Sequence, residues 1–117
     1  MRAAVIFSGH PRRIDAHFEN LKKNILGPLD NPDIFFHFWE HPLSQQAIDL
    51  LQPKAYEIEP QKNFFSYKNW KQHRSWNIVN TPSMWYSIWS ANELKKKYER
   101  GNSFTYDLCV RFRTDLL

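Results

Sequence analysis

Two apolar runs constrain the fold of this chain more than any other feature of its sequence. They are AAVIF at residues 3–7 and DIFFHFW at residues 33–39, and neither alternates cleanly between apolar and polar positions. Strands of this kind are buried on both faces, as they are in parallel sheets. The residues between the runs that share one helical face are Ile14, Phe18, Leu21 and Ile25. A helix between two buried strands makes a parallel crossover, so the sequence predicts an α/β fold.

The rest of the chain continues the alternation of strands and helices. We expect a short helix from Ser44 to about Gln52, a half-exposed strand over 54–59, a long loop over 60–80, a helix from Thr81 to about Arg100, and a last strand over 105–113. The long helix should turn Met84, Ile88, Ala91 and Tyr98 toward the sheet. We therefore predict one domain over residues 1–117, a Rossmann-like open sheet of about four mainly parallel strands with helices on both faces.

Composition limits the partners and the compartment. The net charge of +4 and the pI near 9.3 favour an anionic partner. The single cysteine, Cys109, excludes an internal disulfide and is predicted to be a buried thiol. No apolar run is long enough to span a membrane, and the apolar start is too short for a signal peptide, so we expect a cytoplasmic protein. Five tryptophans raise a homodimer as a way to cover an apolar face.

Polar residues gather where the predicted strands end. Ser8, Gly9, His10 and Arg12 follow the first run, His37 and Trp39 close the second, and Arg111, Arg113 and Asp115 close the last strand. Open parallel sheets bind their ligands beyond the carboxyl ends of the strands. We therefore expect one rim that binds an anionic ligand carrying a flat ring. The chain has neither a dinucleotide-binding glycine motif nor a P-loop.

Each of these groups also has a purely structural interpretation. Ser8 and Gly9 could form only a tight turn, and Arg12 a solvated helix start, although arginine there favours a bound phosphate. His37 could be a hydrogen-bonded core histidine, and Trp39 either a packing residue or a platform for a base. A zinc site at His37, Glu40 and His41 is not favoured, because these residues end a strand and Pro42 follows.

The last strand offers a candidate for metal binding. Arg111, Arg113 and Asp115 have one parity and share a face of an extended strand. They could form an ion-pair ladder. Alternatively, Asp115 gives an oxygen to a hard cation while the arginines face phosphate oxygens.

Four segments resemble one family. "VIFSGHPRR", "PDIFFHFWE", "PSMWYSIWSANELKKKYE" and "YDLCVRFRTDLL" are similar to segments of a group of bacterial and viral glycosyltransferases of the GT-A fold. Those proteins open on an SGxxR strand and loop, carry DVFxHxW and MxYSI signatures, and end their nucleotide-binding half on an arginine-rich strand at the DxD position. The resemblance covers nearly the whole chain outside residues 60–80.

The resemblance implies a UDP-sugar donor and a Mn²⁺ or Mg²⁺ ion. Asp115 matches the metal-binding aspartate of DxD, whereas Arg113 stands at the first aspartate position. Ser8, Gly9 and Arg12 match the nucleotide loop, His37 and Trp39 the second-strand signature, and Ser83 the helix-start signature. Family members continue into an acceptor-binding half, so we expect a donor-binding half, either truncated or naturally minimal. The acceptor and the catalytic base stay unassigned.

Two other functions remain open. The segment YKNWKQHRSW, residues 67–76, interleaves basic and aromatic side chains as single-stranded nucleic-acid binders do. A catalytically inactive interaction domain that keeps only the fold is the second alternative. Stabilisation by UDP with Mn²⁺ would favour the glycosyltransferase, and stabilisation by poly-U would favour nucleic-acid binding. Stabilisation by neither would favour the inactive interaction domain.

Overall fold

The computed structural model describes residues 2–60 and 80–112, and among these the side chains from residue 84 onward in the second range. Its centre is a sheet of four strands in the order β3-β2-β1-β4, and each neighbouring pair is parallel. The strands are β1 (Ala3–Gly9), β2 (Asp33–Trp39), β3 (Ala55–Glu59) and β4 (Leu108–Phe112). The predicted open parallel sheet is therefore confirmed.

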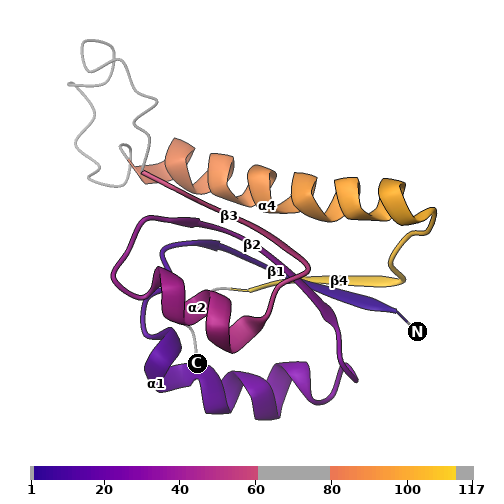
Figure 1. The fold of residues 1–117 in the computed structure, drawn as a ribbon, viewed down its shortest axis with the longest axis horizontal. Helices are drawn as coiled ribbons and strands as arrows, with labels where there is room; N and C mark the ends of the chain where they lie inside the picture. Colours follow the sequence, from indigo (N-terminus) through magenta and orange to yellow (C-terminus); the bar gives the residue numbers. More distant parts are fainter. Residues whose placement is uncertain (1, 61–79, 113–117) are drawn as a thin grey trace.

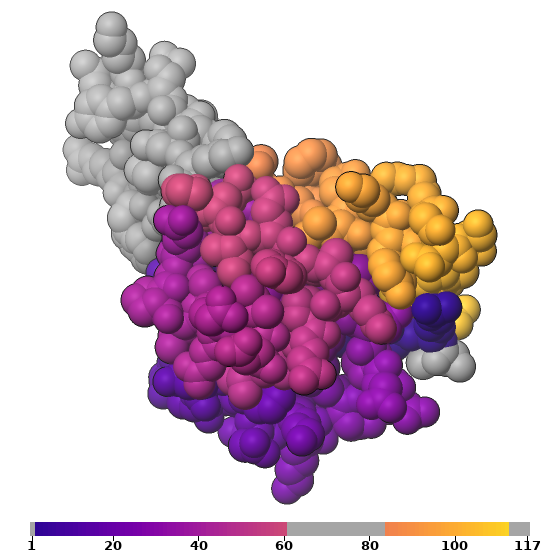
Figure 2. All heavy atoms as spheres, viewed as in Figure 1, coloured from indigo at the N-terminus to yellow at the C-terminus, as the bar shows by residue number. Residues whose placement is uncertain are grey.

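Helices cover both faces of this sheet. On one side lie α1 (Ile14–Leu21), the π-helical turn η1 (Lys22–Leu26) and α2 (Ser44–Leu51), and on the other lies α4 (Asn80–Asn102) (Figure 1). Residues of α2 and β3 occupy the middle of the surface in Figure 2, with α1 below them and α4 above. No helix in the two described ranges is long and apolar enough to cross a membrane.

The face under α1 and α2 holds the hydrophobic core. Its buried members are Val5, Phe7, Ile14, Leu21, Ile34, Phe36, Phe38, Ala47 and Leu51. Phe18 and Ile25 pack against this cluster, as their predicted helical face requires. The π turn continues that face beyond α1, and it closes with a bond from the Gly27 N–H to the Lys22 carbonyl at 2.8 Å.

The helix starts differ from the sequence prediction. Ser44 is the first residue of α2, and its N-cap is Leu43, without a side-chain cap. Instead, the Ser44 hydroxyl accepts the His41 N–H at 3.0 Å and so fixes the turn after β2. Gly101 lies within α4 instead of ending it, since the helix extends to Asn102.

The inner face of α4 also differs from the prediction. Ala91 is buried as expected, but Met84 is 42% exposed, and Ser87 and Ser90 are buried in its place. The sheet-facing side of α4 was predicted from its apolar residues, but this helix packs small side chains against the sheet. Small side chains let a helix axis approach its neighbour closely.

The prediction of a buried Cys109 is wrong. The thiol is exposed because β4 is an edge strand, paired only with β1 among the described strands. Leu108, the first residue of β4, is likewise 37% exposed. A mid-strand position therefore did not imply burial here.

Candidate functional site

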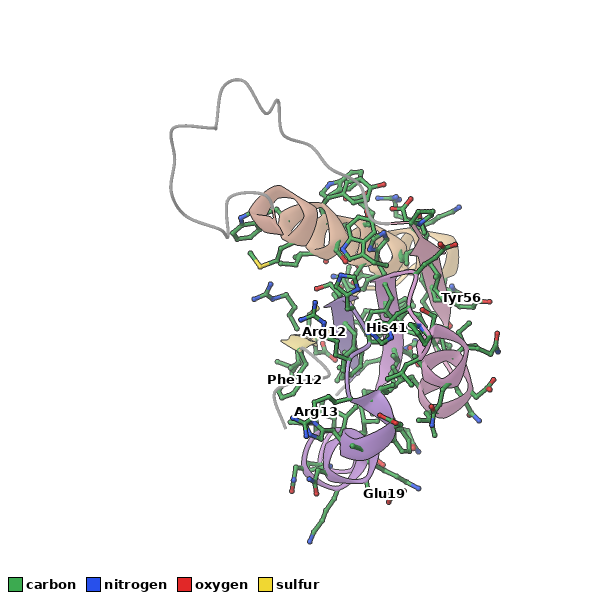
Figure 3. All side chains as sticks on the ribbon, turned by 90° about the vertical axis from the view of Figure 1, so that its left-hand side faces the viewer. Arg12, Arg13, Glu19, His41, Tyr56 and Phe112 are labelled. Carbon is green, nitrogen blue, oxygen red and sulfur yellow. The ribbon has the colours of Figure 1, made fainter. Side chains whose placement is uncertain are left out.

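The carboxyl ends of the four strands lie along one edge, which faces the viewer in Figure 3. Parallel pairing sets the members of this rim beside one another, because Ser8 lies opposite His37 and Phe7 opposite Phe112. Arg12 lies between Phe112 at the end of β4 and His41 after β2 (Figure 3). The structure thus brings residues from three chain segments to one edge.

Gly9 ends β1 in a conformation that favours glycine. Its φ is +88°, and no atom of the described residues lies within 4 Å of the position that a Cβ atom would occupy. The backbone there is therefore open to a close-lying ligand. Ser8 is 8% exposed, so its side chain is directed away from solvent. Arg12 and Arg13 follow as exposed residues, and Arg13 takes a left-handed φ of 60° immediately before α1.

His37 is the centre of a buried hydrogen-bond network. The imidazole is fully buried. Its Nδ1 lies 2.7 Å from the Ser87 hydroxyl of α4, and its Nε2 lies 2.6 Å from Oε1 of Glu59 on β3. The Gly9 N–H donates to the same Ser87 hydroxyl at 2.7 Å. One histidine and one serine therefore connect the carboxyl ends of β1, β2 and β3 with α4.

The hydrogens in this network can be assigned by counting donors. A carboxylate of Glu59 only accepts, so His37 Nε2 carries a hydrogen. Nδ1 of the neutral ring then accepts the Ser87 O–H, while Ser87 accepts the Gly9 N–H. The His37 carbonyl, 3.0 Å from the Ser87 hydroxyl, is a second acceptor for the same hydrogen. The serine hydrogen thus has two possible acceptors: Nδ1 when that nitrogen carries no hydrogen, and the His37 carbonyl when Nδ1 itself donates to Ser87.

A serine, a histidine and a glutamate in line resemble a hydrolytic triad, but this arrangement does not support nucleophilic catalysis. Ser87 is fully buried and accepts a backbone N–H, so a substrate carbonyl has no access to its oxygen. The network positions α4 over the sheet.

Aromatic rings pack around His37. The Trp39 ring meets the His37 ring edge-on at 4.7 Å and stacks on Tyr86 of α4 at 5.7 Å. Trp39 is only 2% exposed. Its ring is therefore used for packing in this arrangement and offers no face to a base.

Two acidic residues of the rim were not among the residues singled out in the sequence. Glu57 and Glu59 lie on β3 with the same parity, and together with His37 they bring three potential metal-ligand atoms within 4.8 Å of one another. The β2–β3 register sets Glu57 opposite His37. The E-x-E spacing on a strand was the available signal, since it places two carboxylates on one face.

The remaining candidates are less completely placed. Arg111 is exposed on β4 beside Ile6. His10 lies near the rim, with its ring 6.0 Å from that of His41. Arg113, Asp115 and the basic aromatic segment 67–76 lie outside the described residues, as does the side chain of Ser83.

A shallow hollow of about 450 Å³ lies away from this rim. It is formed by the end of α4 and the residues after it, and is lined by Lys96, Glu99, Arg100, Ser103, Phe104 and Thr105. These residues precede β4, so the hollow lies toward the amino ends of the strands. Parallel sheets bind their ligands at the other end, and we assign no ligand to this hollow.

Comparisons with known proteins do not identify a family for this chain. No protein-family model, curated protein or solved structure matches the chain. The function therefore has to be argued from the site and the sequence signatures.

Proposed function

We propose that this chain is the donor-binding domain of a GT-A-like, metal-dependent glycosyltransferase that binds a UDP-sugar for sugar transfer or donor hydrolysis. The observation that carries the proposal is Gly9. Its open backbone lies at the carboxyl end of the central strand β1, with Arg12 following it in the adjoining loop. The four sequence signatures of the family supply the choice of ligand.

The strand order supports this position for the donor. From β1 the chain proceeds to β2 and β3 on one side, while β4 lies on the other side of β1. This change of direction is a topological switch point, where open α/β sheets leave a crevice for ligands. Gly9 and Arg12 lie on one side of that point and Arg111 on the other.

The described groups at this point suit a diphosphate. Arg12 and Arg111 are exposed cations, and arginine pairs well with phosphate oxygens. An ion such as Mn²⁺ or Mg²⁺ would screen the charge of the diphosphate and of the leaving nucleotide. We assign it to Asp115 on the sequence alone, from its place after the last strand and from the family resemblance.

Arg12→Ala tests the diphosphate position. One charge-assisted contact is worth about 1.5–3 kcal/mol, so UDP affinity should fall roughly 10- to 150-fold while uridine affinity hardly changes. Calorimetry of UDP and of uridine, each with Mn²⁺, measures both. Arg100→Ala removes an exposed arginine at the far end of α4 and is the matched control.

Three outcomes would contradict the proposal. Equal losses for uridine and UDP would make Arg12 structural. A thermal-shift panel in which poly-U stabilises the chain more than UDP or UDP-sugars with Mn²⁺ would favour nucleic-acid binding instead, and no shift with any nucleotide would favour an inactive interaction domain.

A further inference from the structure

We propose that His37, Glu57 and Glu59 bind a divalent metal ion of the Zn²⁺ type, an ion other than the one that the sequence assigns to Asp115. The imidazole comes from β2 and both carboxylates come from the adjacent strand β3. Their ligand atoms already lie within 4.8 Å of one another. The proposal rests on this cluster alone and does not depend on the proposed glycosyltransferase function.

His37 is held as a metal-binding histidine needs to be held. It is fully buried, and the rings of Trp39 and Tyr86 pack edge-on against it. Its Nδ1 contacts Ser87, which leaves Nε2 as the atom directed at the carboxylates. Histidines that bind metals usually donate their other N–H to such a partner, which fixes the ring and its tautomer.

The network around Ser87 is complete in the metal-bound tautomer as well. With an ion on Nε2, the hydrogen of the neutral ring lies on Nδ1 and is donated to the Ser87 oxygen. The Ser87 O–H then turns to the His37 carbonyl, 3.0 Å away, while the Gly9 N–H still donates to the serine. Replacing the hydrogen on Nε2 by a metal therefore leaves no polar atom of this network without a partner.

Only the carboxylates have to move to admit the ion. Ligands at about 2.0–2.1 Å in a tetrahedral arrangement lie roughly 3.3 Å apart, whereas Nε2 and the Glu59 oxygen are now 2.6 Å apart. Glu59 must therefore withdraw by less than one ångström. Its side chain is 17% exposed and Glu57 is exposed, so both carboxylates adjoin solvent and can adjust.

The ligand set selects the class of ion. One imidazole nitrogen with two carboxylate oxygens suits Zn²⁺, Co²⁺ or Fe²⁺ better than Mg²⁺ or Ca²⁺, which prefer oxygen ligands alone. Solvent beside Glu57 can supply a water ligand. The ion would join β2 to β3 and, through Ser87, to α4 and the Gly9 loop.

The test uses the full chain after treatment with EDTA. Calorimetry with Zn²⁺, and visible absorption with Co²⁺ as a spectroscopic substitute, should show one equivalent bound and a rise in Tm. Glu57→Gln removes an exposed ligand without disturbing the core, and it should weaken binding at least tenfold. Glu40→Gln removes an exposed glutamate that is not in the cluster, and His41→Gln removes the histidine next to His10. Neither should change the affinity.

Four results would overturn the assignment. Absence of binding would leave His37 and Glu59 as a hydrogen-bonded pair only. Unchanged affinity in Glu57→Gln, or reduced affinity in His41→Gln, would place the ion elsewhere. A sulfur-to-cobalt charge-transfer band would place it on the exposed Cys109. Glu57 is not part of the proposed donor site, so UDP binding with Mn²⁺ should be unchanged in Glu57→Gln, and the two proposals can fail separately.

Discussion

The two faces of the sheet are held by different interactions, although the same strands build both. On the face under α1 and α2, Val5, Phe7, Phe36 and Phe38 pack in a continuous apolar core. On the face under α4, hydrogen bonds of His37 connect the sheet to the helix. The first kind of contact is not directional, whereas the second is, so the α4 face sets the geometry of the rim.

This difference explains why the sequence did not reveal the polar contacts of the face under α4. Alternate residues of a strand point to opposite faces, so DIFFHFW divides into Ile34, Phe36 and Phe38 on one side and Phe35, His37 and Trp39 on the other. Aromatic residues on both sides conceal the one position that needs polar partners. Burial of the imidazole is possible because Ser87 and Glu59 satisfy both ring nitrogens.

The largest effect should come from breaking the apolar face. Phe36→Ala removes a fully buried ring that stacks on Phe38 at 4.3 Å. The free energy of unfolding should fall by about 3–5 kcal/mol, from transfer and cavity costs together. Urea unfolding followed by circular dichroism measures it. Tyr56→Ala is the control, because that ring lies beside Phe36 but is 48% exposed. Equal losses in both variants would refute the assignment of the core to this face.

Much of the fold could be predicted because it depends on local patterns. The runs at 3–7 and 33–39 gave two strands, and strand 33–39 was predicted with the bounds that the structure has. The prediction that Cys109 is buried was wrong because its strand lies at the edge of the sheet. Strand order decides which strand lies at the edge, and a local sequence pattern does not contain that order. The prediction that Met84 faces the sheet was wrong because it chose the helix face with the most apolar residues, whereas the face that packs on the sheet carries small residues.

The candidate site was predicted only in part, for a related reason. His37 was identified as a rim residue, but its partners Ser87 and Glu59 were not. They lie 50 and 22 positions away along the chain. Their meeting depends on the β2–β3 register and on the rotation of α4, and single residues specify neither. Gly9, in contrast, was predictable, because a glycine after a buried strand marks a backbone turn.

A smaller effect should follow from removing one atom of the polar face. Ser87→Ala leaves the part-buried Gly9 N–H and the buried His37 Nδ1 without their shared partner. The free energy of unfolding should therefore fall by about 1–3 kcal/mol. Ser90→Ala, one turn along the same buried helix face, is the matched control and removes a hydroxyl outside this network. If the two variants lost the same stability, the network would contribute no more than ordinary helix packing.

The smallest effect concerns a second polar contact of the α4 face, near the amino ends of the strands. The Tyr106 hydroxyl donates to the Asp33 carboxylate at 2.6 Å, and the Tyr106 ring packs edge-on against Phe35. Tyr106→Phe keeps the ring and removes the hydrogen bond. Because this contact is only part-buried and Asp33 keeps its ion pair with Arg2, the loss should be about 0.5–1.5 kcal/mol at neutral pH. Tyr56→Phe, on an exposed ring, should cost nothing measurable.

The pH dependence distinguishes this hydrogen bond from general packing. Burial raises the pKa of Tyr106 well above its usual value, and the neighbouring Asp33 carboxylate raises it further. The folded chain therefore holds the phenol proton after the unfolded chain has begun to lose it, at about pH 10. The stabilisation by this hydroxyl is complete below that pH and declines above it. The difference in unfolding free energy between the wild type and Tyr106→Phe should thus shrink from about pH 8 to about pH 11. A constant difference across that range would show that the hydroxyl ionises alike in the folded and unfolded chain, and that the contact with Asp33 does not hold its proton.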